Sequence, residues 1–82
     1  MTRTEIFDKV KGLMGEVFGE ENVQDIAENT VFREVDYWDS LGQMTFLDAV
    51  ETAFGVRFDF DDIVGLDSVS ILLDILEKKL QG

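Results

Sequence analysis

The residues with the clearest chemical potential run Trp38-Asp39-Ser40-Leu41-Gly42. A serine at the start of a helix is the arrangement of a hydrolase nucleophile elbow, in which the hydroxyl attacks an acyl carbon. That motif requires a glycine two residues before the serine, where this chain has tryptophan. It also requires a histidine as the base, and the chain contains no histidine. The sequence therefore predicts no hydrolase chemistry and no catalytic residue.

A second candidate is the acidic stretch that begins at Asp59 and ends at Gly65. A calcium-binding EF-hand loop needs an oxygen ligand at its fifth position and a glycine at its sixth. Counted from Asp59, those positions hold Ile63 and Val64. The chain also lacks cysteine, which excludes thiolate zinc sites and disulfides. We therefore predict no dedicated metal site, and we interpret the stretch as an acidic helix start.

The overall charge restricts the partners. Among 82 residues, 18 Asp and Glu stand against 7 Lys and Arg, which gives a net charge of -11. Such a surface is repelled by nucleic acid and by anionic membranes, and it attracts proteins with basic docking patches. No apolar run approaches the roughly 20 residues of a membrane-spanning helix, and no export segment is visible. We expect a monomer in the cytoplasm.

Helices must position these residues. Thr2 and Glu5 have the spacing of a capping box, which predicts a helix that continues to Phe18 and ends at Gly19. Residues 19–39 show no sustained period and form an unusually long connection. Five apolar residues within it predict that it is pinned to the core, with a helical turn inside: Val23, Ile26, Val31, Phe32 and Val35.

The second helix is predicted over residues 41–54. Ser40 and Gln43 form a second capping-box pattern, Asp39 adds negative charge at the helix start, and Gly55 ends the helix. Residues 56–60 alternate like a strand but have no partner strand, so we interpret them as a linker that inserts Val56 and Phe58 into the core.

The remaining chain predicts a short helix at residues 61–65 and a last helix capped by Asp67 or Ser68. The sum is an all-α bundle of three main helices and one short helix, with a long first loop. At this length we expect residues 1–82 to form a single domain.

The outward face of the second helix carries two apolar side chains, Leu41 and Met44, beside two carboxylates, Asp48 and Glu51. Scattered apolar residues are common on protein surfaces. The position of these two directly after Ser40 favours a docking patch as the alternative. Residue types alone leave both interpretations open.

This pattern resembles the acyl carrier protein family. The segment Asp39-Ser40-Leu41 opens a helix that continues through Met44, Leu47, Val50, Glu51 and Phe54, and the order and spacing of the elements match the family over nearly the whole chain. The resemblance implies a carrier rather than an enzyme. It implies that a phosphopantetheinyl transferase attaches 4′-phosphopantetheine from coenzyme A to Ser40, and that acyl groups are held on the arm as thioesters.

The resemblance also implies docking of biosynthetic enzymes with basic patches at Asp39, Leu41, Met44, Asp48 and Glu51. Gly42 and Thr45 stand where many fatty-acid carriers have acidic residues, and Tyr37-Trp38 stands where small residues are common. We therefore expect a stand-alone carrier in fatty acid, polyketide or related lipid biosynthesis. An aminoacyl or peptidyl carrier, or an acidic helical interaction module without covalent cargo, remains the alternative.

Overall fold

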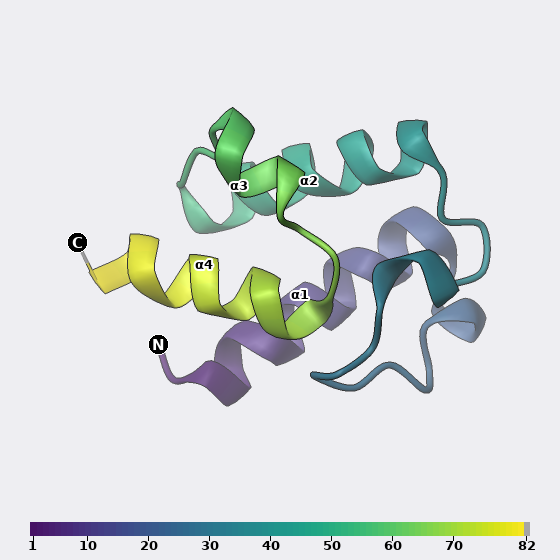
Figure 1. Ribbon diagram of the computed structural model, residues 1–82. Coiled ribbons are helices and arrows are strands. Elements are labelled where there is room, and N and C mark those ends of the chain that lie inside the picture. Colours follow the sequence, from purple (N-terminus) through teal and green to yellow (C-terminus); the bar gives the residue numbers. More distant parts are fainter. Residues whose placement is uncertain (82) are drawn as a thin grey trace.

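Four helices make up the computed structural model, which describes residues 1–81 (Figure 1). They are α1 (Arg3–Phe18), α2 (Ser40–Phe54), α3 (Phe60–Val64) and α4 (Val69–Gln81), and no strand forms within these residues. Helix α1 packs against both α2 and α4. The expected all-α bundle of three main helices and one short helix is confirmed. No helix in the described part of the chain is both long and apolar enough to cross a membrane.

Helix α1 forms where the sequence predicts it. The Thr2 hydroxyl accepts a hydrogen bond from the Glu5 N–H, and the Glu5 carboxylate accepts one from the Thr2 N–H at 2.8 Å. These two hydrogen bonds hold the pKa of Glu5 below its ordinary value. Apolar residues at spacings of four then face the core: Ile6, Val10, Met14 and Phe18.

The long connection between α1 and α2 is fixed at both ends. Two 3-10 turns form within it, at Glu20–Asn22 and Phe32–Glu34, and four of the five apolar residues predicted to pin it are buried, while Val31 is half-buried. A two-residue antiparallel bridge also joins Val31 to Ser68. The Phe32 N–H donates to the Asp67 carbonyl at 2.9 Å, and the Val69 N–H donates to the Thr30 carbonyl at 3.0 Å. The connection is therefore fastened to the turn between α3 and α4.

Helix α3 starts one residue earlier than predicted. Asp59 is the N-cap, and its carboxylate and that of Asp62 form a reciprocal capping box. Burial raises the pKa of Asp62. The hydrogen bond from the Asp59 N–H and the ammonium of Lys79, 3.0 Å away, together lower it by more, so the pKa lies below its ordinary value. Lys79 thereby ties α3 to α4. The interpretation as a linker holds for residues 56–59, where Val56 and Phe58 are half-buried against the core, whereas Phe60 already belongs to α3.

One cation joins three parts of the chain. The guanidinium of Arg3 bonds to Glu28 in the long connection at 2.5 Å, to Asp74 in α4 at 2.8 Å, and to Glu77 in α4. The hydrogen bonds to Glu28 and Glu77 raise the pKa of Arg3 further above its ordinary value. In a chain of net charge -11, this pairing relieves repulsion where α1, α4 and the connection meet.

We predict that Arg3→Met lowers the free energy of unfolding by about 1 kcal/mol, because three carboxylates lose their shared partner. Arg57→Met is the matched control. Arg57 is exposed and forms no ion pair within residues 1–81, and its loss changes the net charge by the same amount. Urea unfolding of both variants measures the difference, and equal losses would contradict a specific role for Arg3.

Candidate functional site

The start of α2 is capped differently from the sequence prediction. Asp39, not Ser40, is the N-cap: its backbone is extended, and its Oδ1 accepts a hydrogen bond from the Gly42 N–H at 2.6 Å. Ser40 is the first helical residue and is exposed. The predicted Ser40–Gln43 capping box is therefore wrong. A carboxylate accepts a stronger, charge-assisted hydrogen bond than a hydroxyl, so Asp39 takes the cap and leaves the serine hydroxyl free of that role.

The side chain of Gln43 has a different partner. Its Oε1 accepts a hydrogen bond from the Trp38 indole N–H at 3.2 Å. The contact links the residue two positions before Ser40 to the residue three positions after it. The backbone on both sides of the serine is thus held by a side-chain bond that the sequence pattern did not reveal.

Trp38 itself lies within a cluster of four aromatic rings. Its ring stacks on Phe18 at a centroid distance of 4.9 Å and on Phe32 at 4.6 Å, and it meets Phe46 edge to face at a centroid distance of 5.9 Å. Phe18 ends α1, Phe32 belongs to the long connection, and Phe46 lies in α2. Stacked and edge-to-face pairs of this kind stabilise beyond their buried area. The cluster therefore holds the start of α2 against two other elements.

Gly42 permits this arrangement. A Cβ atom at this position would lie 2.7 Å from Cε1 of Phe18 and 3.0 Å from Oδ1 of Asp39. The Phe18 ring is buried and stacked on Trp38, so a shift of the ring would disturb the aromatic cluster. The close approach of Phe18 is thus a packing reason for glycine at position 42.

The predicted docking residues differ in accessibility. Leu41 and Met44 are 77% and 56% exposed, and Asp48 is exposed on the same helix. Glu51 is half-buried, and its Oε2 accepts a hydrogen bond from the Phe58 N–H at 2.8 Å. Asp48, Met44 and Leu41 are therefore free to meet a partner, whereas Glu51 also holds the chain segment that follows α2.

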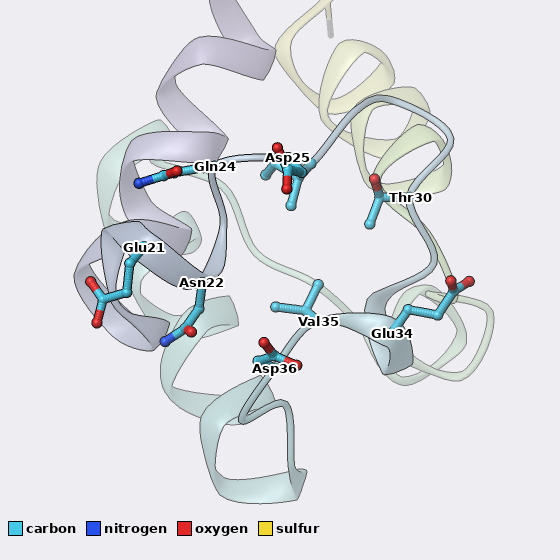
Figure 2. Close-up of a pocket in the computed structure, with 9 residues that line it drawn as sticks. Glu21, Asn22, Gln24, Asp25, Thr30, Glu34, Val35 and Asp36 are labelled. Atoms are coloured by element: carbon cyan, nitrogen blue, oxygen red, sulfur yellow. The ribbon is translucent and has the colours of Figure 1, made fainter.

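A hollow of about 360 Å³ lies between the two 3-10 turns and was not foreseen from the sequence. Figure 2 shows that the carboxylates of Glu21 and Glu34, on its two sides, point away from its centre. No group of three or more acidic side chains within residues 1–81 is arranged to hold a metal ion. The hollow is an acidic surface depression, and its lining does not include Ser40.

Two comparisons identify similar proteins. A family model described as "phosphopantetheine attachment site" matches residues 8–76, which include all of α2 and α3. The chain is also 33% identical to the acyl carrier protein of Thermotoga maritima over an alignment of 84 positions, which covers 96% of each chain. Both matches extend over most of the chain and are not confined to a short motif.

We predict opposite effects of alanine at two glycines. Gly42→Ala should lower the free energy of unfolding by at least about 1 kcal/mol, because the new methyl group collides with Phe18 and disturbs the Asp39 cap. Gly12→Ala, in α1, should raise the free energy by about 0.5 to 1 kcal/mol, because its Cβ meets nothing within 4 Å. Thermal and urea unfolding test both.

The collision at position 42 has its own control. In the double variant Gly42→Ala, Phe18→Leu, the smaller side chain gives the methyl group room. The double variant should therefore lose less unfolding free energy than the sum of the losses in the two single variants. Strict additivity would show that the close approach of Phe18 is not the cause.

Proposed function

Because this chain belongs to the family of proteins with a phosphopantetheine attachment site, which includes the acyl carrier proteins, we propose that Ser40 is the residue that carries the group. Members of this family hold 4′-phosphopantetheine covalently and act as carriers, not as catalysts. Accessibility is the observation that supports Ser40 best. The chain has three serines, at positions 40, 68 and 70, and only Ser40 is exposed.

The other two hydroxyls are already engaged. The Ser68 Oγ accepts a hydrogen bond from the Ile71 N–H at 3.3 Å at the start of α4. The Ser70 Oγ accepts one from the Arg3 guanidinium at 3.3 Å. Both residues are half-buried. Modification at either position would break a contact that stabilises the bundle, whereas the Ser40 hydroxyl can react without such a loss.

The surroundings of Ser40 fit a phosphodiester. The first N–H groups of a helix lack intrahelical acceptors and carry partial positive charge. The Gly42 N–H donates to the Asp39 carboxylate and the Gln43 N–H to the Asp39 carbonyl, which leaves the N–H groups of Ser40 and Leu41 to face an anion. When bound, the arm supplies a terminal thiol that holds cargo as a thioester. The chain has no cysteine, so this sulfur comes only from the group.

The proposed cargo is an acyl group, as an intermediate of fatty acid, polyketide or related lipid biosynthesis. The similarity to an acyl carrier protein over 96% of the chain supports acyl cargo over an aminoacyl or peptidyl cargo. The family match also removes the main support for an interaction module without covalent cargo. Intact mass spectrometry of the protein isolated from its own cells tests the proposal, since the mass beyond the arm distinguishes an acyl group from an amino acid.

The outward face of α2 is the proposed docking surface. Leu41 and Met44 offer apolar contact beside Ser40, and Asp39, Asp48 and Glu51 offer negative charge to basic partner surfaces. The Glu51 carboxylate also accepts a hydrogen bond from the Phe58 N–H, so charge reversal at Glu51 would disturb the fold as well as the surface. Asp48 is therefore the better position at which to test the charge.

We predict that Ser40→Ala abolishes modification. In coenzyme A and Mg²⁺ with a broad-specificity phosphopantetheinyl transferase, the unaltered chain should gain the mass of one phosphopantetheinyl group, and the variant should gain none. The variant should lose no more than about 0.3 kcal/mol of unfolding free energy, because Asp39 provides the cap. Ser70→Ala is the control and should still be modified. A mass gain that persists in Ser40→Ala would contradict the assignment.

We predict that charge and apolar contact act on different rates of docking. Asp48→Lys should slow association with the transferase several-fold and weaken its salt dependence, because the charge steers the encounter. Met44→Ala should mainly raise the dissociation rate. Surface plasmon resonance at several salt concentrations measures both. Asp8→Lys, at an exposed position of α1, makes the same charge change elsewhere, and an equal effect from it would exclude a local role for Asp48.

A further inference from the structure

Two adjacent aromatic residues before Ser40 have opposite surroundings. Trp38 stacks between two other rings, whereas Tyr37 is 78% exposed. Tyr37 is also the only tyrosine in the chain. A large aromatic side chain that is left in solvent adds little to the core, so the fold alone gives no reason for its type.

The backbone of Tyr37 makes this choice more unusual. Its φ is 68°, and within residues 1–81 it is the only residue other than glycine with a positive φ. This left-handed conformation is unfavourable for a residue with a bulky side chain, and glycine and asparagine adopt it more readily. The turn has a structural purpose, because the Trp38 N–H bonds to the Val35 carbonyl at 3.1 Å as the indole ring enters the core. The turn is needed, but a tyrosine at its tip is not.

The position of Tyr37 suggests what the side chain contacts. Three peptide units separate it from Ser40, so their Cα atoms lie at most about 11 Å apart. A specific interface covers roughly 800 Å² on each partner, which is wide enough to include both. Asp36 and Asp39 flank the tyrosine and are exposed, and Leu41 is exposed beyond Ser40. An enzyme that acts on Ser40 can therefore reach an exposed aromatic ring that has carboxylates near it in the chain.

We propose that Tyr37 is a docking residue for the phosphopantetheinyl transferase, whose matching surface is an apolar recess bordered by basic groups. This inference rests on the proposed attachment at Ser40. Tyrosine suits such a role because its ring buries a large area, its hydroxyl can hydrogen-bond at the rim, and few torsions are fixed on binding. The strained backbone then reflects stability given up for recognition.

Tyr37→Asn separates recognition from folding. Asparagine tolerates the left-handed backbone, so the melting temperature should equal or exceed that of the unaltered chain. The KM of the chain as a transferase substrate should rise about fivefold or more, with kcat within twofold, because only a docking contact is lost. Tyr37→Phe keeps the ring and should restore most of the difference. An unchanged KM for Tyr37→Asn would overturn the proposal.

Phe60→Asn is the matched control. Phe60 is 68% exposed at the start of α3, which lies near the end of α2 remote from Ser40 (Figure 1). Its replacement should leave the KM unchanged, and an equal rise in both variants would overturn a specific role for Tyr37.

The proposal of attachment at Ser40 and the proposal of docking at Tyr37 are contradicted by different results. If the unaltered chain is not modified, attachment at Ser40 is wrong, whereas normal modification with an unchanged KM in Tyr37→Asn removes only the docking role.

Because Tyr37 is the sole tyrosine, nitration provides a direct measurement. Tetranitromethane should add one nitro group to the free Ser40→Ala chain, and the addition should slow several-fold when transferase and coenzyme A are in excess. The Ser40→Ala background prevents turnover during the measurement. Nitration at an undiminished rate in the complex would show that the transferase does not cover Tyr37.

Discussion

The placement of one tryptophan ring governs the geometry of this carrier. Trp38 lies between Phe18 and Phe32, at centroid distances of 4.9 and 4.6 Å, and so joins the end of α1, the long connection and the start of α2. Several other features depend on it. Gly42 is required because Phe18 approaches the helix so closely, and Gln43 accepts the indole N–H. The exposed serine thus stands on a packed aromatic base, although it lies at the end of a long loop.

Electrostatics shape the rest of the molecule. The few cations of this acidic chain are used where elements meet: Arg3 joins α1 to the connection and α4, and Lys79 joins α3 to α4. Lys9 of α1 donates to the Ala53 carbonyl near the end of α2, where the helix dipole favours a cation. Among residues 1–81, no cation forms an ion pair with Asp48 on the outward face of α2. The negative charges of Asp39 and Asp48 therefore remain available to a partner that approaches Ser40.

The sequence predicted what depends on local spacing. Patterns within a few residues revealed the Thr2–Glu5 capping box, the apolar stripe of α1, the buried residues of the long connection and the end of α2. It did not predict which of two adjacent polar residues caps α2, because Asp39 and Ser40 both suit the position. The reason for Gly42 and the partners of Arg3 were also hidden, since each depends on residues that are distant in the chain.

The bridge between Val31 and Ser68, with the hydrogen bond from the Val69 N–H to the Thr30 carbonyl, fastens the start of α4 to the connection that leads to Ser40. The bridge closes a long chain loop that contains all of α2 and α3. Closing this loop costs conformational entropy, which the packing of the enclosed helices must offset. Residues from both sides of the bridge also line a cleft of about 100 Å³ beside Trp38, including Phe32, Gln43 and Leu66. A chain truncated before α4 would keep the attachment motif and the residues of this cleft, but it would lose the hydrogen bond from the Val69 N–H to the Thr30 carbonyl and the buried leucines of α4 that pack against the rest of the core. The last helix, which offers no proposed reactive group, thus sets the minimal length at which the carrier site can be transplanted into another protein.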